Sequence, residues 1–368
     1  MNIKALLSKK STALEVADDI KNQLTGFDVK MLVYFASWDA YEYDEIASAM
    51  QSAFPESVVF GCTSHAELFK GITEFNAVTA MAFNSEVISD AKVEVLENIS
   101  SEIIVKPAFD SFDSYFNTPM ASVDYREYGG MVLIDGLSMS EELVMDKIGT
   151  QSNIMFIGGS ASDSFKFDKH TYVFANGKAY TDAALLAIFK TKNGVDFIKT
   201  QSVDVQDTVL TVTKADGRAV IEFDNKPAAI RYAEVLGVER SEIDTMFFAN
   251  PLGLIIDSDV YIRSCPKTDG DTMFFYCSIM EGMELSHLKI KDILPDTKLA
   301  VDEKIKELGS IAGLIEFRCG FRTVQLDMEG NLGKYADIFN DLEAIGFSSY
   351  GEQSLGHMNQ TSTMIVFK

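Results

Sequence analysis

Short apolar runs alternate with amphipathic segments over the first half of the chain. Residues 31–36 (MLVYFA) and 58–60 (VVF) have the length and composition of buried strands. Between them apolar residues recur at helical spacing from Ile46, and Pro55 ends the helix. The pattern predicts a strand–helix–strand unit. Its second strand leads into Gly61-Cys62-Thr63-Ser64, which we expect to form a polar turn where open α/β sheets bind ligands.

Two further apolar strands of the first half also end in small residues. Strand 131–134 leads into Asp135-Gly136, and strand 154–157 leads into Gly158-Gly159-Ser160. Loops at strand ends on a rigid sheet commonly carry binding groups, so these turns are candidate site segments. The simpler interpretation, that glycine is present only to make a turn, stays open.

The same signals predict the remaining elements. Capping-box spacing of Thr12 with Glu15 and of Ser138 with Glu141 predicts helix starts, and Asn176-Gly177 and Asp216-Gly217 predict hairpin turns. We expect helices near residues 13–24, 103–116, 138–148, 227–236, 297–308 and 335–342, and strands near residues 75–83, 92–96, 183–189, 200–213, 219–223, 254–256, 273–277, 313–317 and 344–348, with a last strand ending at residue 367.

The character of the sequence changes near Gly194, where long alternating β-branched segments begin. A chain of 368 residues also exceeds the size at which one hydrophobic core usually stops growing. We therefore predict an α/β (α+β) protein of two domains, residues 1–194 and 195–368, each a mixed sheet flanked by helices.

Composition narrows the choice of partners. The formal net charge is −23, and such a field repels nucleic-acid phosphates and anionic membrane surfaces. Four cysteines in 368 residues are too few for a disulfide scaffold. The first residues, MNIKALLSKKST, lack the apolar core of a signal peptide, and no apolar run approaches the 18 or so residues of a membrane span. We expect a cytoplasmic protein with reduced thiols that binds neither nucleic acid nor membranes.

The predicted turns do not favour a phosphate ligand. They lack the glycine spacing of dinucleotide-binding loops and the Gly-Lys-Ser/Thr ending of a phosphate loop. Acidic residues also follow the turns where a phosphate would require cations, namely Glu67, Asp135, Asp163 and Asp168. An amine, an amino acid or an uncharged ligand fits these surroundings better.

Cys62 and His65 offer two kinds of chemistry. With a base and a third orienting group, Cys62 would be a nucleophile. Cys62-x-x-His65 is also half of a zinc site, but the remaining cysteines lack paired ligand spacing, so we expect no metal. A small residue packed at a strand end is the simpler interpretation of Cys62.

Two polar residues of the last third are candidates for ligand binding. His357, in a polar segment before the last strand, is the best placed of the four histidines for an axial haem ligand. A hydrogen-bonded loop histidine is the simpler interpretation. Arg322 follows a predicted strand end and would clamp a carboxylate in this acidic chain; the alternative for such an arginine is an ion pair with a neighbouring acid.

The chain resembles the FIST sensory module, which has an amino-terminal and a carboxy-terminal half. The resemblance spans roughly residues 28 to 368 and rests on the order and spacing of short motifs. In the first half these are Val33-Tyr34-Phe35, Phe54-Pro55, residues 59–64, Asp135-Gly136-Leu137, and residues 158–161 with Asp163 and Asn176-Gly177; in the second half they are Lys226-Pro227-Ala228, residues 250–253, Phe317-Arg318-Cys319 with Arg322, Gly351-Glu352 and Asn359-Gln360-Thr361.

The resemblance implies a cytoplasmic signal-input module for small ligands, with amino acids among them. Such modules are often fused to output domains. This sequence ends at Lys368 without one, so we expect the signal to pass to a separate protein, such as the histidine kinase of a two-component system. Some stand-alone relatives are haem proteins that sense nitric oxide and control a histidine kinase.

These observations lead to one main hypothesis and three alternatives. We predict a sensor without catalytic activity that binds an amino acid or related metabolite between the two halves, where pockets commonly form, with a second copy of the chain as a further partner. The alternatives are a haem-based nitric oxide sensor using His357, an enzyme with Cys62 as nucleophile, and a scaffold. The predicted ligand-binding residues are Gly61, Cys62, Thr63, Ser64, Gly158, Gly159, Ser160, Arg322, Glu352 and Asn359.

Overall fold

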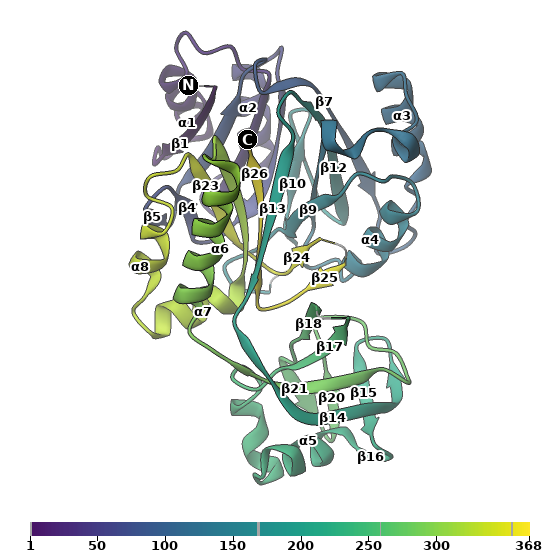
Figure 1. Ribbon diagram of the computed structural model, residues 1–368. Coiled ribbons are helices and arrows are strands. Elements are labelled where there is room, and N and C mark those ends of the chain that lie inside the picture. The colour runs from purple at the N-terminus through teal and green to yellow at the C-terminus, as the bar shows by residue number, and fades with distance from the viewer. Residues whose placement is uncertain (1, 168–169, 258, 355) are drawn as a thin grey trace.

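Three six-stranded mixed sheets surround a common centre, and a fourth sheet forms a separate lobe (Figure 1). This computed structural model describes residues 2–167, 170–257, 259–354 and 356–368, so Asp168 lies outside the described residues. Helices cover the outer faces of the three sheets, which confirms the predicted α/β class with mixed sheets flanked by helices.

The three large sheets are built from three units with the same order of elements. The middle of each sheet consists of two parallel strands that are connected by one or two helices. A hairpin follows the second of these strands. The first unit consists of β1 (Ile3–Ser8), α1 (Ala13–Gln23), β2 (Met31–Ser37), α2 (Tyr43–Ala53), β3 (Val58–Ser64), the hairpin β4 (Glu67–Phe69) and β5 (Ile72–Glu74), and β6 (Val78–Phe83).

The second and third units repeat this order. The second consists of β7 (Ile88–Glu97), α3 (Lys106–Phe116), β8 (Tyr128–Ile134), α4 (Glu141–Gly149), β9 (Phe156–Ser160), the hairpin β10 (Val173–Ala175) and β11 (Lys178–Tyr180), and β12 (Ala183–Thr191). The third consists of β13 (Val195–Gln201), α6 (Ile293–Leu308), β22 (Gly313–Cys319), α7 (Gly320–Met328), α8 (Leu332–Asp337), β23 (Ala344–Ser349), the hairpin β24 (Glu352–Gln353) and β25 (His357–Met358), and β26 (Thr361–Phe367).

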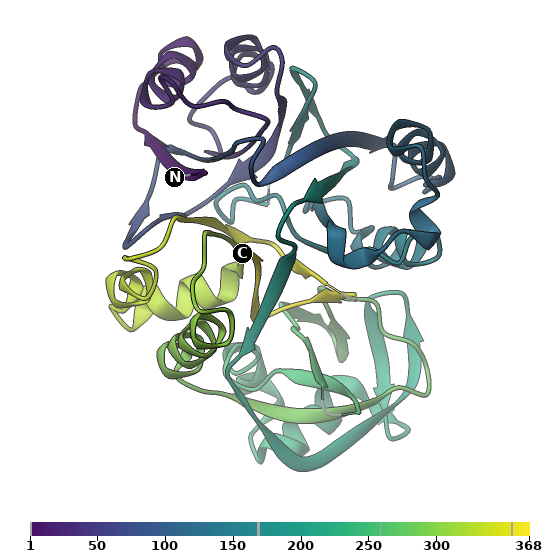
Figure 2. The ribbon, with the colours of Figure 1, turned by 45° about the horizontal axis from the view of Figure 1, so that its top comes forward.

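Each unit gives its hairpin to the sheet of another unit. Strand β4 pairs with β23, β10 pairs with β3, and β24 pairs with β9, so the exchange runs once around the molecule. Figure 2 shows the three units arranged around the centre, with the green and yellow elements of the third unit below the first unit. The two halves of the chain therefore share two of their sheets.

An inserted subdomain, residues 203–290, separates β13 from α6 and forms the lower lobe in Figure 1. Its sheet packs on α5 (Ala228–Leu236) around a core of its own. The remaining elements are β14 (Val203–Asp216), β15 (Ala219–Phe223), β16 (Lys226–Pro227), β17 (Leu252–Ile256), β18 (Asp259–Arg263), β19 (Lys267–Asp269), β20 (Thr272–Phe274) and β21 (Glu284–Ile290). The predicted turn at residues 216–217 joins β14 to β15, and that at residues 176–177 joins β10 to β11.

Burial on both faces explains the continuous apolar runs. In β2, Met31, Val33 and Phe35 point into the core shared by the three large sheets, whereas Leu32 and Tyr34 lie under α1 and α2. A strand covered on both sides loses the polar alternation that a half-exposed strand keeps. All four cysteines are free and buried, and within the described residues no helix has both the length and the apolar character needed to cross a membrane.

Two predicted turns are wrong, because residues 61–64 lie within β3 and residues 158–160 lie within β9. A Cβ atom on Gly61 would lie 1.8 Å from the carbonyl oxygen of Tyr34, and one on Gly158 would lie 1.6 Å from that of Val132. Glycine is therefore required there for close approach of the neighbouring parallel strand, which is a packing requirement. The third predicted turn, at residues 135–136, does follow the end of β8.

Candidate functional site

A cavity of about 200 Å³ lies where the second unit, the third unit and the inserted subdomain meet. The second unit contributes the β8–α4 and β9–β10 connections, the third unit contributes the ends of β22 and β23 with the start of α7, and the subdomain contributes two side chains. The lining residues are Gly136, Leu137, Met139, Glu141, Phe165, Phe167, Arg218, Tyr276, Cys319, Gly320, Phe321, Ser349, Tyr350 and Asn359.

Five of the fourteen residues that line the cavity are aromatic. Phe167 stacks on Tyr350 with ring centroids 5.1 Å apart, and Tyr276 lies 5.7 Å from Phe321. Met139, Phe165 and Phe167 have φ angles of 55°, 61° and 49°, which bulky residues rarely adopt. Backbone strain of this kind concentrates at binding sites, where the surrounding structure holds it. These loops are therefore built for a specific shape of the wall.

The phenol of Tyr350 holds one of these loops in place. It donates a hydrogen bond to the carboxylate of Asp163 and accepts one of 2.8 Å from the backbone N–H of Phe165. Burial, together with the hydrogen bond to Asp163, raises the pKa of Tyr350 well above its usual value. The phenol therefore stays protonated and fixes Phe165 against the cavity.

A buried carboxylate gives the cavity a negative side. Glu141 is 2% exposed and accepts a 2.9 Å hydrogen bond from Arg218, whose same nitrogen reaches Glu142 at 2.8 Å. Two carboxylates thus face one guanidinium. The predicted capping box is wrong, because Glu141 pairs with Arg218 and the hydroxyl of Ser138 donates to the carbonyl of Asp135. Glu141 and Arg218 both line the cavity.

The start of α7 gives another wall of the cavity a partial positive charge. Residues 319–321 line it, and Cys319 at the N-cap supplies no side-chain hydrogen bond to the first helical turn. The first N–H groups of a helix carry a partial positive charge and have no partner within the helix. A Cβ atom on Gly320 would lie 2.6 Å from the ring of Phe165, so only glycine lets this loop pack against the helix start.

One predicted ligand-binding residue, Asn359, lines the cavity. Its side-chain oxygen accepts hydrogen bonds from the backbone N–H of Ser264 (3.3 Å) and from the thiol of Cys277 (3.1 Å). Arg322 lies elsewhere, and its guanidinium donates to the hydroxyl of Thr297 at 2.8 Å inside the third unit. The alternative interpretation, an ion pair with a neighbouring acid, is wrong, because the partners of this guanidinium among the described residues are the hydroxyl of Thr297 and the carbonyl of Thr200, both neutral.

The other predicted residues lie in the contacts between units and not in the cavity lining. Thr63 pairs with the backbone of Tyr172 next to β10, whereas Gly158 and Gly159 pair with the two residues of β24. The hydroxyl of Ser160 accepts a hydrogen bond of 2.8 Å from Gln353. These residues position the exchanged hairpins.

Two buried glutamates occupy equivalent places in two of these hairpins. The hydroxyl of Ser64 donates to Glu67, and that of Ser349 donates to Glu352, each at 2.6 Å. Glu352 also accepts a 2.6 Å hydrogen bond from Thr361. Burial raises the pKa of both carboxyl groups to about 7, against the partial opposition of these hydrogen bonds. Glu352 is thus a buried polar group in the contact between the third unit and the second.

The surroundings of Cys62 and His65 disfavour both nucleophilic catalysis by Cys62 and zinc binding by the two residues. The thiol of Cys62 is fully buried, and burial followed by the charge of Glu67 raises its pKa, which disfavours a thiolate. The ring of His65 packs against Phe75 and Phe165 with centroids 5.4 and 5.5 Å away.

The surroundings of His357 do not fit a haem group. Its imidazole is 3% exposed, its Nδ1 lies 3.0 Å from the side-chain oxygen of Gln353, and its ring packs on the backbone of Gly351, where a Cβ atom would lie 2.0 Å away. A haem macrocycle is also larger than the 200 Å³ cavity, which His357 does not line. Burial alone would lower the pKa of His357, but Cys277 and two nearby glutamates raise it to about 9.

Comparison with known proteins identifies related sequences over most of the chain. The family model described as the FIST N domain matches residues 30–226, and that described as the FIST C domain matches residues 228–354. The matches meet within the inserted subdomain. The uncharacterized protein MJ1623 of Methanocaldococcus jannaschii is 24% identical over 308 residues, which cover 79% of this chain and 59% of that protein. The chain thus spans little more than half the length of this relative.

Proposed function

Because the chain belongs to the FIST family, whose domains are associated with sensing in signal transduction, we propose that it senses a small ligand bound in the cavity between its units. The observation that carries the proposal is the enclosure of a buried carboxylate and a helix start within one aromatic cavity. The role proposed is binding without catalysis.

The ligand proposed is an amino acid with an apolar side chain, or a closely related metabolite. Its ammonium group would contact the carboxylate of Glu141. Arg218 pairs with this carboxylate and also with that of Glu142. Its carboxylate would meet the first N–H groups of α7, as anions do at helix starts. The aromatic wall would cover the side chain. A volume of about 200 Å³ suits such a ligand, since drug-sized molecules use about 300–1,000 Å³.

The output proposed is a change in the contact of this chain with a separate signalling protein in the cytoplasm, such as a histidine kinase. The rim of the cavity supports this idea, because the side chains of Met139 and Phe167 are 60% and 50% exposed. A ligand that orders these side chains would change an apolar patch on the surface. The free energy for the change would come from the difference in ligand affinity between the two arrangements.

A thermal-shift screen of the full chain against amino acids tests the proposal. A ligand at 100 times its dissociation constant should raise the free energy of unfolding by about 2.7 kcal/mol. Glu141→Gln should weaken binding of the amino acid at least about 10-fold, because it removes the charge that faces the ammonium group. The variant should leave the weaker binding of the corresponding acid without an amino group unchanged.

Glu56→Gln is the matched control, since Glu56 is an exposed glutamate in the first unit, outside the cavity lining. It should bind like the unmodified protein. Absence of stabilisation by every amino acid and related metabolite would contradict the proposal, as would equal losses of affinity in the two variants.

A further inference from the structure

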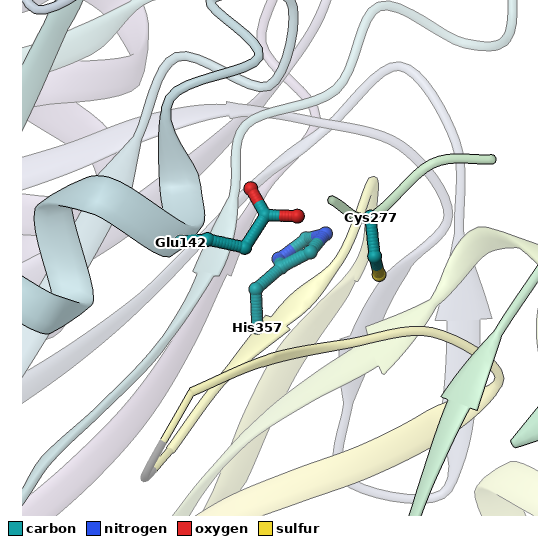
Figure 3. A group of neighbouring side chains, drawn as sticks. All are labelled: Glu142, Cys277 and His357. Atoms are coloured by element: carbon teal, nitrogen blue, oxygen red, sulfur yellow. The ribbon is translucent and has the colours of Figure 1, made fainter. Parts of the chain in front are cut away.

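Three potential metal ligands from three different parts of the molecule meet beside the cavity. Glu142 comes from α4 of the second unit, Cys277 follows β20 of the inserted subdomain, and His357 lies on β25 of the third unit. One carboxylate oxygen, the thiol sulfur and one imidazole nitrogen all lie within 4.8 Å of one another. Figure 3 shows the imidazole between the carboxylate and the thiol. Cys277 and His357 are buried and Glu142 is partly buried.

Hydrogen bonds to Gln353 determine which imidazole nitrogen faces the group. The side-chain nitrogen of Gln353 donates to the carbonyl of Gly351 (3.3 Å), which can only accept, and to Ser160. Its side-chain oxygen must therefore be the atom that lies 3.0 Å from Nδ1 of His357. Nδ1 then carries a proton and donates it. A bound metal would displace the proton on Nε2 and use the lone pair there, the arrangement found for histidines that bind metals.

The other two ligands keep lone pairs available as well. Glu142 accepts hydrogen bonds from the backbone N–H of Ser278 (2.6 Å) and from Arg218 (2.8 Å), but a carboxylate has about four acceptor positions. The thiol of Cys277 donates to the side-chain oxygen of Asn359, a bond that loss of the proton to a metal would replace. Protein contacts therefore orient all three side chains and leave each of them able to bind a metal.

We propose that Glu142, Cys277 and His357 bind one zinc-class divalent ion, with a fourth coordination position left for water or a ligand. A set of sulfur, nitrogen and oxygen ligands suits zinc and its neighbours in the first transition row and does not suit magnesium or calcium. The thiolate and the carboxylate together neutralise the charge of the ion. Arg218, which faces the same carboxylate, is balanced by Glu141.

The ion would tie the three parts of the molecule together at the wall of the cavity. Glu141 and Tyr276 line the cavity and are chain neighbours of Glu142 and Cys277, and Asn359, which also lines it, accepts a hydrogen bond from the thiol of Cys277. No paired ligand spacing marks this site in the sequence, because its members are 135 and 80 residues apart. The site rests on its own contacts and does not depend on the ligand proposed above.

Titration of the reduced, chelator-treated full chain with Co²⁺ tests the proposal. Cobalt should bind at one equivalent and give the thiolate-to-cobalt charge-transfer absorption, and Zn²⁺ should displace it and bleach the band. Cys277→Ser should abolish the band and weaken Zn²⁺ binding by more than about 100-fold, since loss of an outer partner alone costs about 10–100-fold. Gln353→Ala should weaken Zn²⁺ binding by this smaller factor of about 10–100.

Cys265→Ser is the matched control, because Cys265 is a buried cysteine of the same subdomain outside the group. It should keep the band and the affinity. Absence of a charge-transfer band in the unmodified protein would overturn the proposal without any variant, and so would an equal loss in the two serine variants. Circular dichroism of each variant identifies any loss of affinity that comes from unfolding.

Discussion

Replacing Glu352 by Gln will raise the free energy of unfolding by about 3 kcal/mol at pH 8 and by less than about 1 kcal/mol at pH 5. In the folded protein, burial raises the pKa of this carboxyl group from 4.5 to about 7. One pKa unit corresponds to about 1.4 kcal/mol, so a shift of this size is worth about 3 kcal/mol. Above pH 7 the charged carboxylate destabilises the folded protein by this amount. The Gln variant removes the destabilisation, because an amide carries no charge.

The direction follows from proton binding. Between pH 4.5 and 7 the folded protein holds the Glu352 proton while the unfolded chain loses it, so stability falls as pH rises through this window. The contribution is fully present below pH 4.5 and is lost above pH 7. Gln fits the same contacts, because its oxygen can accept from Thr361 and its nitrogen can donate to the hydroxyl of Ser349.

Denaturant unfolding at the two pH values measures the effect. Glu67→Gln should behave alike, since Glu67 occupies the equivalent place in β4 and has a pKa raised to about 7. Glu102→Gln, at an exposed position, is the control and should differ from the unmodified protein by less than about 0.5 kcal/mol at either pH. A pH-independent difference for Glu352→Gln would contradict this account.

Local patterns in the sequence predicted the central strands and several helices. Periodicity identified α2 and the strands on either side of it, and Asn-Gly and Asp-Gly identified two hairpins. The same patterns could not separate a glycine that makes a turn from one that lets two strands approach. Gly61 is of the second kind, and the clash that requires it involves Tyr34, a residue 27 positions earlier.

The cavity was harder to predict because its walls come from segments far apart in the sequence. Asn359 was predicted from a polar segment, whereas Arg218 and Tyr276 belong to a subdomain whose position no local pattern specifies. The exchange of hairpins also placed Glu352 in a contact between units. One signal was available: Ser64 with Glu67 and Ser349 with Glu352 repeat the same spacing, which marks equivalent hairpins.

Replacing Arg318 by Met will lower the free energy of unfolding by about 3–5 kcal/mol, the usual cost of breaking a buried ion pair. Arg318 is fully buried in β22, where its guanidinium lies 3.2 Å from the carboxylate of Glu316. It also donates to Thr323 and, across the contact with the first unit, to the carbonyl of Ala66. The variant leaves the Glu316 charge buried without its cation.

The double variant Glu316→Leu with Arg318→Met separates charge from packing. If the unpaired carboxylate causes the loss, the double variant will be more stable than Arg318→Met alone, because burying two apolar side chains avoids the desolvation of two charges. Some loss should remain, since Tyr335 and Ser362 also donate to Glu316 and would lose their acceptor.

Denaturant unfolding of both variants, with Lys106→Met as control, decides the point. Lys106 forms an exposed ion pair with Asp110, a contact that contributes only about 0.3–0.5 kcal/mol in a helix. Because Arg318 holds the first unit to the third through Ala66, its loss should also increase hydrogen exchange in β4, which pairs with β23 at this contact. An effect of Arg318→Met no larger than that of the control would mean that the buried pair does not hold the units together.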